Sequence, residues 1–141
     1  MKLGTLTMVA AAGLLAASAA QAATEKFAAT LSGGQEVPAN TTTGTGEVDA
    51  ALDTATKAFS YHITFSGLTG PAMAAHFHGP AAPGANGPPV IPIPSPSSPT
   101  SGTATLTDAQ VADLEAGKWY FNVHTAAHPG GEIRGQLQAA R

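Results

Sequence analysis

The chain has 141 residues and a weakly acidic balance, with six Lys and Arg against nine Asp and Glu and a net charge of −3. It lacks the basic clusters that bind nucleic acid or anionic membrane surfaces, so neither is expected as a partner. The absence of cysteine excludes disulfides, thiolate nucleophiles and blue-copper sites, which need a Cys ligand.

The first 22 residues have the pattern of an export signal. Lys2 supplies a positive start, residues 3–20 are rich in Ala, Leu, Val and Gly, and a small-x-small cleavage site ends at Ala22. The apolar run is too weak for a membrane anchor, which needs about 20 strongly apolar residues. We therefore expect a signal peptide over 1–22, a single β domain over 23–141, and a periplasmic or secreted location.

Short segments with period-two alternation predict β-strands along the rest of the chain. The clearest is 59–65, where Phe59, Tyr61, Ile63 and Phe65 share one face. Further strands are expected at 27–31, 46–52, 73–78, 102–106, 119–124 and 132–137. Seven or eight short strands predict an all-β, antiparallel Greek-key sandwich or barrel.

Two segments interrupt the strands. Residues 81–99 hold most of the prolines, which lack the N–H that a central strand needs, so an ordered surface loop with an edge piece at Val90 and Ile91 is expected. Thr107 and Gln110 form a capping-box pattern that predicts one short helix through Leu114.

Four blocks of the sequence resemble the CHRD domain, first described as the repeat of chordin. They are Leu31–Pro38 (LSGGQEVP), Ser66–Gly70 (SGLTG), Ala75–Pro80 (AHFHGP) and the closing block Gly117–Leu137. The resemblance implies a secreted β-sandwich, which in bacteria is a stand-alone exported protein and in animals is part of a large extracellular binding protein. It implies little about activity.

Four histidines lie in the blocks that carry this resemblance: His76, His78, His124 and His128. His76 and His78 are two residues apart on a strand, so their side chains leave the same face, and His124 is on the face opposite Trp119, Phe121 and Val123 of another strand. If the two strands are neighbours, three imidazoles converge and His128 can approach from the turn. Imidazole suits both copper and zinc, so we predict a metal site with copper first and zinc second.

Other polar residues near these histidines have two interpretations. Glu132 could accept a hydrogen bond from a ligating imidazole, or could belong with Arg134 to an ion pair or hydrogen bond that ties the last strand to its neighbour. Tyr120 shares the face of His124 and could shield the site. His62 lies on the polar face of a different strand and is set aside, and Met73 is expected to face the core.

The motifs favour a binding protein over an enzyme. Neither a Gly-x-Ser-x-Gly elbow nor a His-Glu-x-x-His motif is present. The first hypothesis is a metal-binding module for sequestration, delivery or redox protection, with a second copy of the chain as a possible partner in a metal-bridged homodimer. The alternatives are a non-catalytic extracellular interaction module and, more weakly, a copper-dependent superoxide dismutase.

Overall fold

The computed structural model describes residues 12–16 and 21–141. The predicted signal peptide, residues 1–22, lies mostly outside the described residues and stays a prediction. Within the described ranges, no helix has both the length and the apolar character needed to cross a membrane.

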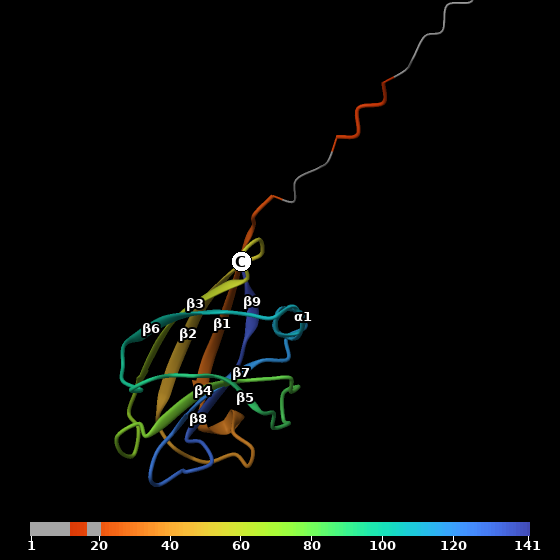
Figure 1. Ribbon diagram of the computed structural model, residues 1–141. Coiled ribbons are helices and arrows are strands. Elements are labelled where there is room, and N and C mark those ends of the chain that lie inside the picture. The colour runs from red at the N-terminus through yellow and green to blue at the C-terminus, as the bar shows by residue number, and fades with distance from the viewer. Residues whose placement is uncertain (1–11, 17–20) are drawn as a thin grey trace, which may run out of the picture.

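The folded part is an antiparallel β structure with one α-helix (Figure 1). The main sheet has the strand order β5-β4-β7-β8-β1-β2-β3-β6, and β9 also pairs with β1. The elements are β1 (Thr24–Ser32), the 3-10 turn η1 (Gly33–Gln35), β2 (Thr45–Asp53), β3 (Ala58–Ser66), β4 (Ala74–His78), β5 (Pro89–Pro92), β6 (Thr100–Thr105), α1 (Asp108–Glu115), β7 (Tyr120–His124), β8 (Ile133–Gln136) and β9 (Gln138–Ala140).

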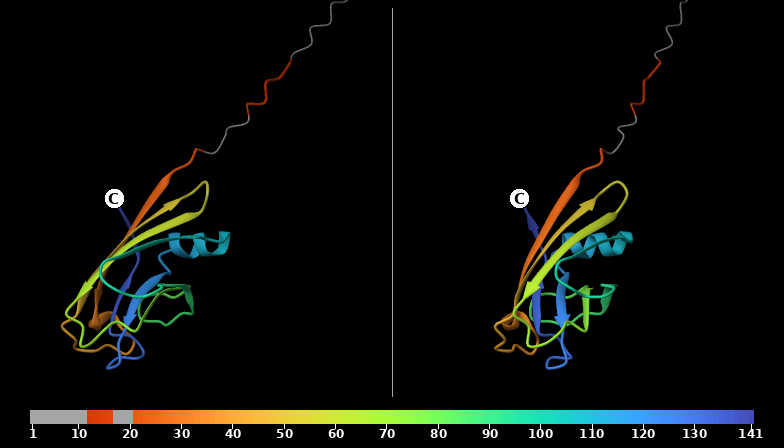
Figure 2. Two further views of the ribbon diagram at one scale, coloured as in Figure 1. Left: turned by 60° about the vertical axis from the view of Figure 1, so that its left-hand side comes forward. Right: turned by 90° about the vertical axis from the view of Figure 1, so that its left-hand side faces the viewer.

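The sheet bends round into a nearly closed barrel, so that the long strands β1, β2 and β3 face the shorter strands β4, β7 and β8 (Figure 2). Strands β1 to β3 follow one another as hairpins, and β8 returns from late in the chain to lie beside β1, which is Greek-key connectivity. The predicted fold class, with its eight-strand path and single helix, is confirmed.

The core fills the space between the two halves of the barrel. Phe59 from β3 packs edge-on against Phe77 from β4, with ring centroids 5.3 Å apart, and Trp119 and Phe121 join them at the other side. All four side chains have no exposed surface. Burying an aromatic side chain of this size stabilises the fold by roughly 1.5–3 kcal/mol, so this aromatic group fixes how β3 lies over β4 and β7.

The helix begins where the capping-box pattern places it. The Thr107 hydroxyl accepts from the Gln110 backbone N–H at 3.2 Å, and the Gln110 side chain accepts from the Thr107 N–H at 2.9 Å. Gly117 follows the helix with φ of +72°, a left-handed conformation that glycine adopts without strain. Leu114 is the buried residue of this helix and turns it toward the barrel.

The proline-rich segment is an ordered loop with a strand at the sheet edge, as predicted. Strand β5 contains Val90 and Ile91 and pairs with β4 at the end of the strand order. The preceding part of the loop is bonded to β8, because Arg134 donates to the Ala85 carbonyl at 2.6 Å and to Asn86 Oδ1 at 3.0 Å. Residues 79–88 therefore fold back over β4, β7 and β8.

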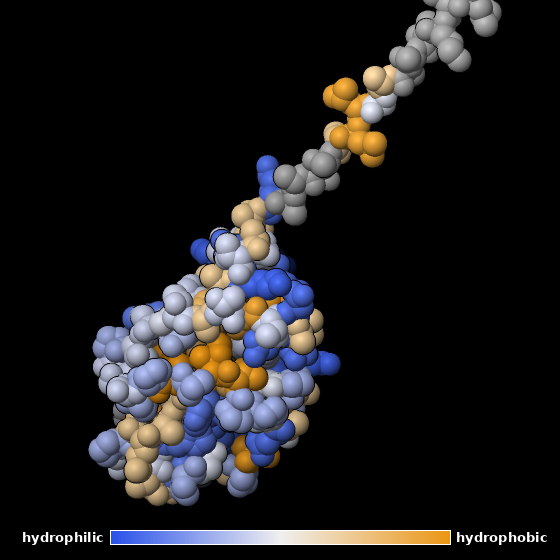
Figure 3. Space-filling model, viewed as in Figure 1, coloured by the Kyte–Doolittle hydropathy of each residue, from blue (hydrophilic) through white to orange (hydrophobic). Residues whose placement is uncertain are grey.

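Figure 3 shows a mainly polar surface with an apolar patch on the visible face.

The prediction that Met73 faces the core is wrong. Within residues 21–141, Met73 is the exposed large hydrophobic residue, with 67% of its surface accessible. Strand β4 begins only at Ala74, so the alternation that buries Ala75 and Phe77 does not extend back to Met73.

The predicted last strand, residues 132–137, corresponds to β8, and a further strand that was not predicted, β9, follows it at Gln138–Ala140. Between them the Leu137 N–H bonds to the Trp119 carbonyl at 2.9 Å, and its side chain is fully buried. Beyond Leu137 the chain pairs with β1, as β9.

Candidate metal centre

Strands β4 and β7 are antiparallel neighbours, and this pairing brings the histidines together. Ala74 lies opposite His124, and His76 lies opposite Asn122. Residues directly opposite each other in a sheet share a face, so His76, His78 and His124 all leave the outer face of the barrel. The intervening Ala75, Phe77 and Val123 are buried in the core, as the alternation predicts.

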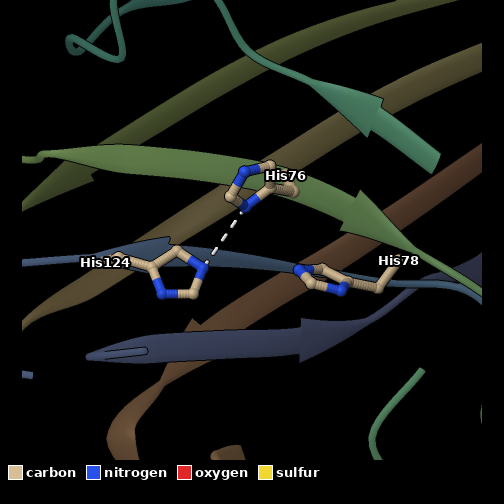
Figure 4. A group of neighbouring side chains, drawn as sticks. All are labelled: His76, His78 and His124. Carbon is tan, nitrogen blue, oxygen red and sulfur yellow. Dashed lines mark hydrogen bonds between the residues drawn. The ribbon is translucent and has the colours of Figure 1, made fainter. Parts of the chain in front are cut away.

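The three imidazoles form one compact group (Figure 4). One nitrogen from each ring lies within 4.8 Å of the others. His76 Nδ1 and His124 Nε2 are joined by a hydrogen bond of 3.3 Å, whose proton a bound metal ion would replace. Two ligands bound at about 2.0 Å to a tetrahedral ion are also about 3.3 Å apart, so this pair already has the spacing that one metal ion requires.

His124 is oriented by the turn that follows β7. Its Nδ1 donates a hydrogen bond to the Pro129 carbonyl at 2.9 Å. The proton on Nδ1 leaves the lone pair on Nε2, the atom that faces His76. A backbone carbonyl that fixes the tautomer in this way is a common partner of metal-ligating histidines.

His76 stands between the other two histidines. Its ring centroid is 5.2 Å from that of His124 and 5.4 Å from that of His78. Burial lowers the pKa of His76, and the neighbouring His124 and His78 lower it further. A lowered pKa favours the neutral imidazole, which is the form that binds a metal.

His78 is the most deeply placed of the three. Nδ1 lies 2.9 Å from the Gly87 carbonyl and Nε2 lies 2.9 Å from Asn122 Oδ1. Its ring stacks on Tyr120 with centroids 4.6 Å apart and planes 4° from parallel, and the Arg134 guanidinium lies 3.5 Å from the centre of the same Tyr120 ring. Burial is the main cause that lowers the pKa of His78, and the Arg134 charge adds to it.

The sequence that carries these strands matches one known family. A family model, the CHRD domain, matches residues 27–137, which include β2 to β8 and all three clustered histidines. The chain belongs to the CHRD domain family. No curated protein and no solved structure matches the chain.

The CHRD domain does not bring His128 into the histidine group. His128 lies in the turn after β7, where its backbone N–H donates to the Thr125 carbonyl at 3.1 Å and its carbonyl accepts from Gly131 at 3.0 Å. The geometric group of possible ligands in the described residues contains His76, His78 and His124 alone. His62 is on β3 and bonds to Ser101, away from the group.

Glu132 does not orient an imidazole; it has the second role considered from the sequence, because its N–H bonds to the Val123 carbonyl of the neighbouring strand at 2.7 Å. It is fully buried, and its carboxylate accepts from Thr42 Oγ1 at 2.9 Å, from Thr125 Oγ1 at 2.8 Å and from the Thr69 N–H at 3.0 Å. These bonds join three loops of the CHRD domain at one end of the barrel. Arg134 ties β8 to loop 79–88 and to Tyr120, and in the part of the chain that the structure describes it makes no ion pair.

Three groups around the site were missed by sequence reasoning: Asn122 and the carbonyls of Gly87 and Pro129. Asn122 had a signal, since it lies two residues before His124 and therefore on the same face of β7. The two carbonyls had none, because a backbone oxygen carries no residue-specific signature.

Proposed function

We propose that this CHRD domain binds one transition-metal ion through His76, His78 and His124. The observation that carries the proposal is the 3.3 Å separation of His76 Nδ1 and His124 Nε2, with the third imidazole within 4.8 Å. The pKa shifts of His76 and His78 also favour the uncharged ligand form.

Copper is the first candidate and zinc the second. A nitrogen site binds Cu(II) more tightly than Zn(II) by the Irving–Williams order. The pair spacing suits the tetrahedral geometry of zinc, so this site would hold either ion, and the higher affinity favours copper. Three imidazoles leave a fourth coordination position for water or for a group from another molecule.

The role that fits best is sequestration, delivery or redox protection outside the cytoplasm. His76 and His124 are partly exposed, whereas a purely structural site would be closed from solvent. An accessible site can take up and release its ion. The location rests on the export pattern of residues 1–22.

The test is elemental analysis with copper and zinc titration of untagged protein comprising residues 23–141, which contain β1–β9 and α1. We expect one ion per chain in the wild type, and an affinity at least about 100-fold lower in His76→Ala and in His124→Ala. The matched control is His62→Ala, which removes an exposed histidine outside the group and should bind as the wild type does.

Absent binding, or binding that is equal in all four proteins, would contradict the metal site and favour a non-catalytic extracellular interaction module.

If copper binds, sedimentation velocity of the copper-loaded protein tests the homodimer. A metal-bridged pair would sediment as a dimer, and the titration would give half an equivalent of copper per chain. A superoxide assay on the loaded wild type separates a carrier from a dismutase.

A further inference from the structure

Both ring nitrogens of His78 are engaged within the protein. Nδ1 faces the Gly87 carbonyl and Nε2 faces Asn122 Oδ1, each at 2.9 Å. A carbonyl oxygen only accepts, so Nδ1 must donate to Gly87. Nε2 is therefore the one atom of His78 with which a metal could bond, and Asn122 already occupies it.

The Asn122 contact is poorly matched to a neutral imidazole. A neutral ring has one N–H, which the Gly87 bond uses, so Nε2 presents a lone pair to the Asn122 oxygen. An amide turned by 180° would present its –NH₂ group and donate to the same lone pair. Only in the turned orientation does Asn122 take the electron pair that a metal needs, and its oxygen then faces the Glu36 carboxyl, which can donate its proton to it.

Asn122 is held firmly in this position. It is 3% exposed, lies opposite His76 in the sheet, and its amide lies 3.4 Å from Glu36 Oε1. The parallel Tyr120 ring beneath His78 leaves the imidazole free to shift within its own plane. His78 can thus exchange Asn122 for a metal without leaving the stack.

We propose that Asn122 determines the affinity of the metal site by holding His78 in reserve. The inference rests on the proposed function. His76 and His124 already have the spacing of two ligands and bind the ion first, in place of the weak hydrogen bond between them, and His78 joins only by giving up Asn122. An ion held by two imidazoles and a restrained third can be released more readily than one in a preformed three-histidine site.

The experiment compares Cu(II) affinity and the nitrogen hyperfine pattern in electron paramagnetic resonance for the wild type, Asn122→Ala and Asn122→Ser. A serine side chain is too short to bond Nε2, so both variants should release His78. We expect copper affinity to rise about three- to tenfold, which corresponds to one lost competing hydrogen bond, and the share of copper with a three-nitrogen hyperfine pattern to increase. Circular dichroism selects the variant that keeps the native fold.

Two further variants make the result specific. His78→Ala should bind copper more weakly than the wild type by a smaller factor than His76→Ala does. Adding His78→Ala to the Asn122 variant should abolish its gain.

If the wild type binds copper but both Asn122 variants bind it equally or more weakly, Asn122 orients the ligand and the inference is wrong while the metal site stands. If neither the wild type nor the variants bind copper, the metal site itself is wrong and the inference falls with it.

Discussion

Glu36 is a buried carboxyl group behind the histidine face. It is 5% exposed, and its side-chain partner is the Asn122 amide at 3.4 Å. Burial raises the pKa of Glu36 to about 7, although the Asn122 bond and the Arg134 charge act in the opposite direction. The folded protein therefore keeps a proton on Glu36 at pH values where the unfolded chain has lost it.

This proton makes stability depend on pH. The folded pKa lies above the unfolded value of 4.5, so the stabilisation from Glu36 is complete below about pH 4.5 and is lost as pH rises through about 7. Glu36→Gln stays neutral and should be more stable than the wild type by up to about 3 kcal/mol at pH 8, with little difference at pH 4. Urea unfolding of both proteins at pH 4, 6 and 8 measures the effect, and an equal difference at every pH would contradict it.

At the scale of elements, α1 is held both by packing and by the hydrogen bonds at its N-terminus. It has eight residues, too few for a stable isolated helix, so it needs the core contacts of buried Leu114 and partly buried Val111. The capping box at Thr107 and Gln110 supplies two hydrogen bonds to otherwise unpaired N–H groups. The cap therefore fixes where the helix begins, and the core contacts keep it in place.

Thr107→Ala should lower the free energy of unfolding by about 1 kcal/mol, because it removes the acceptor for the Gln110 N–H. Thr107→Ser keeps the hydroxyl and is the matched control, with a change below about 0.5 kcal/mol. Urea unfolding measures both variants, as shifts of the unfolding midpoint at an unchanged slope of free energy against urea concentration. Equal loss in the two variants would mean that the Thr107 methyl group, and not the cap, is what matters.

Local sequence patterns predict single elements and their faces, whereas the pairing of distant strands depends on the whole fold. Period-two burial identifies β3 and the outward face of His76 and His78, because alternation is a local property of a strand. The pairing of β4 with β7 brings together residues 48 apart in sequence, such as His76 and His124. The sequence could therefore predict the histidine group only on the assumption that these two strands are neighbours. His128 was included on nearness in sequence, yet the turn bonds of its backbone leave it outside the group.

At the scale of the whole molecule, the candidate metal joins two strands that the chain connects only through a long loop and α1. His76 is on β4 and His124 is on β7, with β5, β6 and α1 between them in sequence. An ion that binds only when both strands are in place binds the folded state and not the unfolded chain. Metal binding and folding are therefore thermodynamically linked.

This linkage predicts a stability gain that depends on metal concentration. With free Cu(II) or Zn(II) at 100 times its dissociation constant, the free energy of unfolding should rise by about 2.7 kcal/mol, which for a domain of this size raises Tm by roughly 10 °C. EDTA should reverse the shift, His76→Ala should abolish it, and His62→Ala should retain it. Differential scanning calorimetry over a metal titration measures all of these, and a Tm that copper and zinc leave unchanged would mean that the histidine face has a role other than holding a metal.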